Sequence, residues 1–173
     1  MTSTLTIPTT ASRSRPALDF EALYRDARDD LYAYVATLVR DRAAAEDVTA
    51  QAFERAFRKH RSFRADRGSP RAWLFGIARN AALDELRHRK RQATLVTEPA
   101  SDAPDHATAT VERAAVRAAL ATLAPRDREI VALRFHAGLD TAEVAEVLGV
   151  SRSNAATQLH RAMTKLREAL NDR

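Results

Sequence analysis

The stretch that decides the fold runs from residue 139 to residue 162 and reads LDTAEVAEVLGVSRSNAATQLHRA. Asp140 or Thr141 can cap a short helix, Gly149 breaks that helix, and Ser151 can cap a longer one. A short helix, a three-residue turn with glycine and a longer helix together predict a helix-turn-helix.

The first turn of the longer helix carries polar side chains that can reach base edges in a major groove. Arginine reads guanine and asparagine or glutamine reads adenine through paired hydrogen bonds. The alternative is a packed helical hairpin with a solvated polar face, which would not need this turn and this polar first turn together. The candidate base readers are Arg152, Ser153, Asn154, Thr157 and Gln158, and further along His160 and Arg161 are candidate phosphate contacts.

Two more helices are expected before this motif. One begins near Val111 and runs to about Leu123, and Pro125 opens the next because proline suits a first helical position. Gly138 is the expected stop of the second of these helices. The motif therefore belongs to a helical block at the C-terminal end of the chain.

An acidic spacer precedes this block and separates two basic ones. Residues 92–112 hold no Lys or Arg and four acids, whereas residues 61–91 hold nine bases and three acids and residues 113–173 hold ten bases and seven acids. Residues 92–110 also contain two prolines and no hydrophobic period, which is typical of a linker.

The N-terminal block is predicted to hold three helices. Apolar residues recur at three- and four-residue steps over about 20–39, 43–60 and 70–90, and Ser69 followed by Pro70 is a strong helix start. No segment alternates between apolar and polar residues. The predicted fold class is therefore all-α, with two small helical domains joined by a flexible linker.

The expected domains are a disordered leader at 1–18, a helical domain at 19–91, the linker at 92–110 and a helix-turn-helix domain at 111–173. The leader lacks the apolar stretch of a signal peptide, and no run reaches the ~20 apolar residues of a membrane span. The chain has no cysteine, which fits a cytoplasmic protein. No membrane insertion is expected.

The basic segment 61–91 has the composition of a single-strand binder. Its nine cationic side chains are interleaved with Phe63, Trp73 and Phe75. Such a protein needs cations for phosphate and aromatic platforms for bases, and each stacked base contributes roughly 1–3 kcal/mol. For Trp73 a simpler interpretation is favoured, as an anchor of the hydrophobic core and not as a base platform.

Read together, the two blocks resemble the sigma factors of bacterial RNA polymerase, and the two-block layout resembles the extracytoplasmic-function (ECF) group. The second block matches the family's fourth conserved region at Leu123, Pro125, Arg128, Glu129, Leu133, Arg134 and Gly138. The first block matches the second conserved region at Ala45 to Val48, at Phe53 and Ala56, and from Trp73 to Arg87.

This resemblance implies a function and partners. The chain would be an alternative sigma factor that binds the β and β′ subunits of core polymerase and directs promoter recognition, DNA melting and initiation. The second block would read the −35 element, and the linker would run through the polymerase interior. The implied polymerase contacts are Asp47, Gln51 and Phe53. The implied −10 contacts are Phe63, Arg64, Arg79, Asn80, Asp84 and Arg87.

The chain departs from the family pattern at three places. Many members have a Lys or Arg where Ala156 stands and an Arg where Gln158 stands, which leaves the −35 sequence open and favours Arg152 and Asn154 as readers. The family's usual Gln-Glu is replaced by Ala50 and Gln51, which weakens the transfer of Gln51 as a contact.

Two other classes of function compete with this one. An enzyme is not expected, because the five histidines are scattered and neither a phosphate-binding glycine loop nor a nucleophile motif occurs. No cofactor and no metal are expected. The second alternative is a stand-alone helix-turn-helix regulator that binds duplex DNA as a dimer, although the first block is too short for a receiver or ligand-binding domain.

The resemblance also raises a regulatory hypothesis, because many relatives are held inactive by an anti-sigma partner. A flexible linker at 92–110 would let the two basic blocks close on such a partner or spread over separated promoter elements. An anti-sigma factor is therefore a possible partner here.

Overall fold

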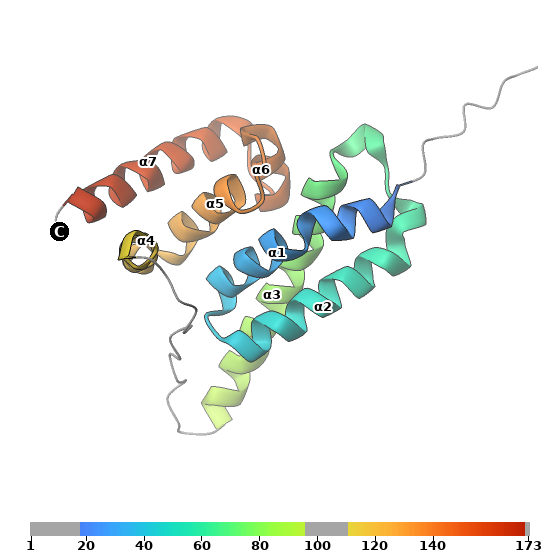
Figure 1. Ribbon diagram of the computed structural model, residues 1–173, viewed down its shortest axis with the longest axis horizontal. Helices are drawn as coiled ribbons and strands as arrows, with labels where there is room; N and C mark the ends of the chain where they lie inside the picture. The colour runs from blue at the N-terminus through green and yellow to red at the C-terminus, as the bar shows by residue number, and fades with distance from the viewer. Residues whose placement is uncertain (1–17, 96–110, 172–173) are drawn as a thin grey trace, which may run out of the picture.

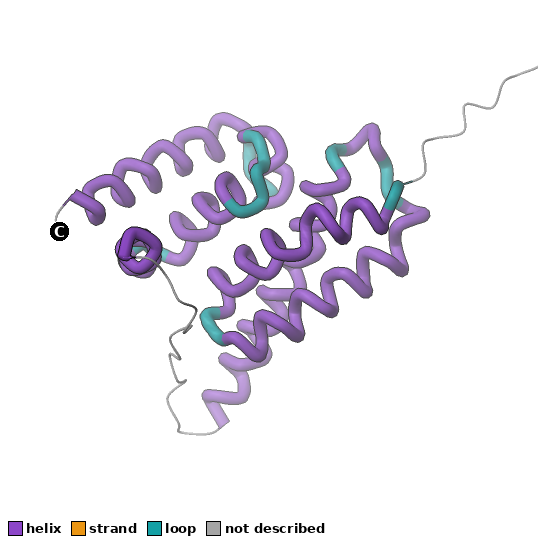
Figure 2. Tube along the Cα trace, in the orientation of Figure 1, coloured by secondary structure: helices purple, strands orange, loops and turns teal. Residues whose placement is uncertain are grey.

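The computed structural model describes residues 18–95 and 111–171, and no strand occurs within those two ranges (Figure 2). The all-α prediction is confirmed. The helices in chain order are α1 (Phe20–Val39), α2 (Arg42–Lys59), α3 (Pro70–Leu95), α4 (Val111–Thr122), α5 (Pro125–Phe135), α6 (Thr141–Leu148) and α7 (Arg152–Asn171). Two short 3₁₀ turns, η1 (His60–Ser62) and η2 (Ala65–Arg67), connect α2 to α3.

The first three helices form one group, which we call the N-terminal group (Figure 1). Each helix starts on a side-chain cap: Asp19 accepts from the Ala22 amide at 3.0 Å, and Asp41 accepts from the Ala44 amide at 2.8 Å. Ser69 Oγ accepts from an amide in the first turn of α3 in the same way. These caps satisfy amides that have no partner within a helix. The group closes over fully buried Leu31, Tyr34, Val35, Val48, Leu74 and Phe75.

The last four helices form the C-terminal group, which contains the helix-turn-helix. Asp140 and Glu143 make a capping box at the start of α6, with the Asp140 side chain accepting two backbone amides. The Glu143 amide contributes most to holding the pKa of Asp140 below its usual value. Gly149 ends α6 at φ 68°, a left-handed conformation that glycine adopts without a steric penalty.

The structure corrects two of the predicted boundaries. The third helix continues to Leu95, past the expected end near Lys90, because the first residue that must stop a helix there is Pro99. The fifth helix ends at Phe135, before the expected stop at Gly138, which instead turns the chain at φ 64°. The predicted leader, except for Leu18, and residues 96–110 of the predicted linker lie outside the described residues.

The two groups pack against each other. In Figure 1, α5 lies beside α1, and α6 lies beside the start of α3, and both pairs of helices are in contact. The buried residues of both groups join in one hydrophobic cluster that runs from Leu23 to Leu166. This packing brings the start of α3 against the helix-turn-helix, and it decides which candidate residues are accessible.

Candidate nucleic-acid and polymerase interfaces

The helix-turn-helix presents its predicted readers to solvent. Ala155 and Ala162 are buried on α7 and Leu159 packs against the core, so the predicted polar readers lie on the remaining faces of the helix. Arg152, Ser153, Asn154, Thr157, His160 and Arg161 are exposed, and Gln158 is half-buried. The first turn is fixed by Ser151, whose hydroxyl accepts from the Asn154 amide at 3.2 Å.

Two hydrogen bonds order the polar face of α7 before any ligand binds. Gln158 Nε2 donates to Asn154 Oδ1 at 2.7 Å, one helical turn away. Thr157 Oγ1 donates to the Ser153 carbonyl at 3.0 Å. The two amides thus lie side by side on the exposed face, each with polar atoms left for a base edge. This polar face is suited to a groove of duplex DNA, with Arg152 at the N-terminal end of α7.

The candidate polymerase residues on α2 separate into two kinds. Asp47 and Gln51 are exposed and lie four residues apart, on one face of the helix. Phe53 is 7% exposed and packs within the N-terminal group, so in this structure it serves the core, and its contact with polymerase stays a prediction. Phe53 packs against α1, where the ring centroid of Tyr24 lies 4.7 Å from that of Phe53.

Phe53 belongs to an aromatic cluster that reaches the surface. Phe57 is 58% exposed, and its ring centroid lies 5.3 Å from Phe20 and 5.4 Å from His60. Tyr24 on α1 is also exposed, at 43%. The end of α2 therefore presents apolar surface on the same helix as the polar pair Asp47 and Gln51.

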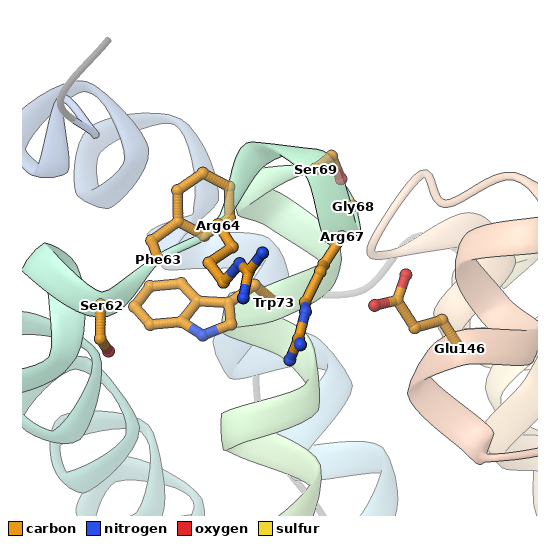
Figure 3. Close-up of a pocket in the computed structure, with 8 residues that line it drawn as sticks. All are labelled: Ser62, Phe63, Arg64, Arg67, Gly68, Ser69, Trp73 and Glu146. Carbon is orange, nitrogen blue, oxygen red and sulfur yellow. The ribbon is translucent and has the colours of Figure 1, made fainter. Parts of the chain in front are cut away.

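A small pocket lies where the two 3₁₀ turns fold over the start of α3, and Glu146 of α6 also lines it (Figure 3). Its aromatic wall is Phe63 and Trp73, with ring centroids 5.4 Å apart, and Arg64 and Arg67 stand at its edge. The volume is about 190 Å³. That is below the ~300–1,000 Å³ of pockets for drug-sized ligands, so the pocket suits one flat group. Trp73 is half-buried, so it both anchors α3 and lines the pocket.

The α3 candidates also divide by their surroundings. Asn80, Asp84 and Arg87 are exposed on one side of the helix. Asp84 accepts from Arg87 at 3.0 Å and lies 3.9 Å from Arg55 on α2. Such exposed pairs contribute only ~0–1 kcal/mol, so they are easily exchanged for another partner.

Arg79 is the exception among the α3 candidates, since it faces the C-terminal group. Its Nε donates to Glu129 Oε1 on α5 at 2.7 Å, and the two side chains are 22% and 8% exposed. Tyr34 on α1 donates to the same oxygen at 3.4 Å. Burial, and next the Glu129 carboxylate, raise the pKa of the Tyr34 phenol well above its usual value, so it stays a donor. In this arrangement Arg79 contacts protein, and its expected contact with DNA stays a prediction.

A second arginine that the sequence did not single out also joins the two groups. Arg71 donates to the carbonyl oxygens of His136, at 3.3 Å, and of Ala137, and it pairs with Asp30 on α1. In the sequence, Arg71 is one of the nine bases of residues 61–91, and Glu129 is one of the residues that match the family's fourth conserved region. Neither pattern indicates a contact between the two groups. The partners of Arg79 and Arg71 lie 50 and 66 residues away, so no local spacing indicates them.

Among the described residues, no group of three His, Cys, Asp or Glu side chains is placed to hold a metal ion. The helices in the described parts of the chain are too short or too polar to cross a membrane.

Comparisons with known proteins agree with this two-group architecture. Residues 23–92 match the family model of Sigma-70 region 2, and residues 113–166 match that of Sigma-70, region 4. The ECF RNA polymerase sigma factor SigL of Mycobacterium tuberculosis is 34% identical over 157 residues, which cover 87% of this chain and 88% of SigL. BldN of Streptomyces coelicolor is 32% identical, over 88% of this chain and 61% of BldN.

Two solved structures share the fold. The sigma factor RpoE from Bartonella quintana, in complex with the anti-sigma factor NepR, has a TM-score of 0.74 at 24% identity and covers 88% of this chain and 97% of its own. CnrH, in complex with the cytosolic domain of CnrY, has a TM-score of 0.65 at 27% identity, with 88% of each chain covered. A stand-alone regulator would have no reason to carry the region 2 match. The chain therefore belongs to the ECF RNA polymerase sigma factors, the alternative initiation factors that bind core polymerase and direct it to promoter DNA.

Proposed function

We propose that this sigma factor divides its work among three surfaces: α2 binds core polymerase, the pocket and α3 hold −10 DNA, and α7 reads the −35 duplex. The observation that carries the proposal is that the α7 readers other than half-buried Gln158 are exposed, while a separate aromatic and cationic pocket lies at the start of α3. The chain acts by binding and not by catalysis, in the cytoplasm with the polymerase.

The polymerase surface proposed here is the exposed side of α2. Asp47 and Gln51 offer one charge and one amide, and the neighbouring Phe57 adds apolar area at the end of the helix. Stable interfaces combine an apolar centre containing aromatic residues with a polar rim, and α2 supplies both. Phe53 supports this surface from beneath by holding Tyr24 and Phe20 in place.

The −10 surface proposed here combines a pocket with a charged helix face. A base that leaves the duplex needs a platform, and Phe63 with Trp73 can supply one in the pocket. Arg64 at the pocket edge can meet the phosphate beside that base. Asn80, Asp84 and Arg87 continue along α3, where they can follow the same strand.

The −35 surface proposed here is the first two turns of α7. Arg152 can read a guanine with two parallel donors, and the paired Asn154 and Gln158 amides can read an adjacent adenine. His160 and Arg161 lie a turn further along and can meet phosphate. Ala156 has no polar atom on its side chain, so position 156 makes no side-chain hydrogen bond to a base.

Replacing Asp47 by lysine tests the polymerase contact. We expect wild-type protein to drive specific run-off transcription by purified core polymerase and D47K to lose more than about tenfold of it, because truncating or reversing a buried interfacial charge costs ~2–5 kcal/mol. The promoter is one that the holoenzyme selects from a random-sequence library. Transcript yield at matched protein concentration is the measurement.

The matched control for D47K is Asp29→Lys, the same charge change on α1 at a side chain that is 84% exposed. D29K should transcribe like the wild type. Equal loss in both variants would remove the specific role of Asp47. Failure of the wild-type chain to stimulate any promoter in the library, together with tight duplex binding without polymerase, would overturn the proposed function itself.

Replacing Arg152 by alanine tests the −35 reader. We expect holoenzyme affinity for the selected promoter to fall by ~1–3 kcal/mol, with relaxed preference at one base pair, because a bidentate contact to guanine is lost. The control is Arg167→Ala, an exposed arginine near the other end of α7. Fluorescence anisotropy at fixed salt, with each base pair varied, separates a specific contact from a phosphate contact.

An anti-sigma factor is a further proposed partner. The similar CnrH structure was solved in complex with the cytosolic domain of CnrY, and RpoE with the anti-sigma factor NepR. The exposed aromatic residues Tyr24 and Phe57 give this chain a surface for such a partner. Affinity purification of the tagged chain from its native host should recover a dedicated inhibitor, and repeated recovery of polymerase alone would count against one.

A further inference from the structure

Two side chains on the polar face of α7 are bonded to each other in the free protein. Gln158 Nε2 donates to Asn154 Oδ1 at 2.7 Å, across one turn of the helix. Many sigma factors carry an arginine where Gln158 stands, and an arginine would bring a positive charge to this face. In this chain the position holds a neutral amide instead, and the hydrogen bond of that amide is made within the protein.

The two side chains differ in how far they are open to a ligand. Asn154 is exposed in the first turn of α7, whereas Gln158 is half-buried one turn further on. The backbone of Asn154 is fixed as well, because its amide donates to Ser151 Oγ at 3.2 Å. In helix-turn-helix proteins the N-terminal residues of the second helix are the ones that meet base edges. Asn154 is therefore placed to meet a base, and Gln158 is placed to hold Asn154.

Asn154 keeps a complete pattern for adenine while it is bonded to Gln158. An amide oxygen has two lone pairs, and an amide nitrogen has two protons. Gln158 uses one lone pair, so Asn154 can still donate to adenine N7 and accept from the adenine N6 amino group. The hydrogen bond also fixes which side of the Asn154 amide carries the oxygen, because turning this amide over by itself would bring two N–H donors together.

The neighbouring Thr157 does not offer the same pattern. Its hydroxyl donates to the Ser153 carbonyl oxygen at 3.0 Å, so its single proton is used within the helix and its oxygen can only accept. Gln158 has atoms left over but is half-buried. Of these three neutral candidates, Asn154 is the exposed one that can both donate to a base and accept from it.

We propose that Gln158 is a positioning residue for −35 recognition: it holds the Asn154 amide in the orientation that reads one adenine, and both side chains serve that single base pair. This inference rests on the proposed −35 role of α7. In water an amide pair one turn apart shifts the helix equilibrium only about twofold, so it adds little to the fold. On binding, a side chain that is already oriented avoids an ordering cost of about two- to tenfold in affinity.

Replacing Gln158 by methionine tests this role in the full chain bound to core polymerase. Q158M keeps the length of the side chain and removes its amide, and Asn154→Ala removes the reader. Thr164→Ala is the matched control, because it removes an exposed hydroxyl of α7 that bonds the His160 carbonyl oxygen at 3.1 Å. Anisotropy of the library-selected promoter, with each −35 base pair varied in turn, gives a preference profile for every variant and for the N154A/Q158M double variant.

N154A should lose a preference for adenine of about five- to 150-fold at one −35 base pair. Q158M should lose about two- to tenfold of the preference at the same base pair. The double variant should match N154A, because a support has no effect once the reader is gone. At that base pair 7-deazaadenine, which lacks the N7 acceptor, should weaken binding by the wild type but not by N154A. Q158M should keep the wild-type salt dependence, since a neutral side chain releases no counterions, and T164A should keep the wild-type profile.

The outcomes separate this inference from the proposed function. A preference lost at a different base pair in Q158M would make Gln158 a reader in its own right and overturn the positioning role. An unchanged Q158M profile beside a changed N154A profile would overturn it and leave the proposed −35 role of α7 standing. Equal weakening of Q158M at every base pair, with a lower melting temperature, would show a purely structural effect and overturn it as well. An unchanged N154A profile would remove Asn154 as a reader together with this inference, while run-off transcription by the wild type still decides the sigma-factor function.

Discussion

Replacing Arg128 by alanine is expected to destabilise the C-terminal group by about 3–6 kcal/mol, because two or more hydrogen bonds of ~1.5–3 kcal/mol each are lost. Arg128 is 9% exposed, and its guanidinium donates to three carbonyl oxygens at the end of α4: Leu120 at 3.0 Å, Ala121 at 3.1 Å and Leu123 at 2.9 Å. Alanine would leave these carbonyls unpaired where water has little access.

Urea denaturation followed by far-UV circular dichroism measures this effect. Arg126→Ala is the matched control, because Arg126 is exposed two residues away on the same helix and should change stability by less than about 0.5 kcal/mol. Since stability of a whole domain is only ~5–15 kcal/mol, R128A should also abolish −35 binding at growth temperature. Coincident unfolding midpoints for R128A and R126A would contradict the structural role.

Phe75→Ala is expected to destabilise the N-terminal group by about 3–5 kcal/mol, the usual cost of emptying a buried phenylalanine site. Phe75 is fully buried on α3, and its ring centroid lies 5.4 Å from that of Tyr34, which is also fully buried. The helices around Phe75 are held in place by other packed side chains, so they cannot close fully over the cavity that alanine would leave.

Phe57→Ala provides the control for Phe75, since it removes the same atoms from a ring that is 58% exposed. F57A should lower the free energy of unfolding clearly less than F75A does. At a temperature where F75A stays folded, F57A should weaken polymerase binding more than F75A does. Equal destabilisation by both variants in thermal melts would show that α2 and α3 do not form the core described here.

Local patterns were sufficient to predict each helix. Apolar residues at three- and four-residue steps, with caps at Ser69, Asp140 and Ser151 and a stop at Gly149, act within about one turn of the chain. For that reason the helix-turn-helix and the exposed face of α7 could be predicted from sequence alone. The end of α3 at Leu95 lies beyond the predicted end near Lys90, because the charge composition changes after Arg91 while no residue there forbids a helix.

The sequence by itself determined the helical class, the two groups and the polar face of α7 that is proposed to read DNA. Only the tertiary structure decided that Phe53 is buried beneath Tyr24 and that Arg79 faces Glu129. Helix propensity and capping depend on neighbours a few residues apart, whereas Tyr34 and Glu129 are 95 residues apart and meet only when the two groups pack. A charged side chain has the same local signature whether its partner is a phosphate or a carboxylate, so its partner is settled by which surface the folded chain brings against it.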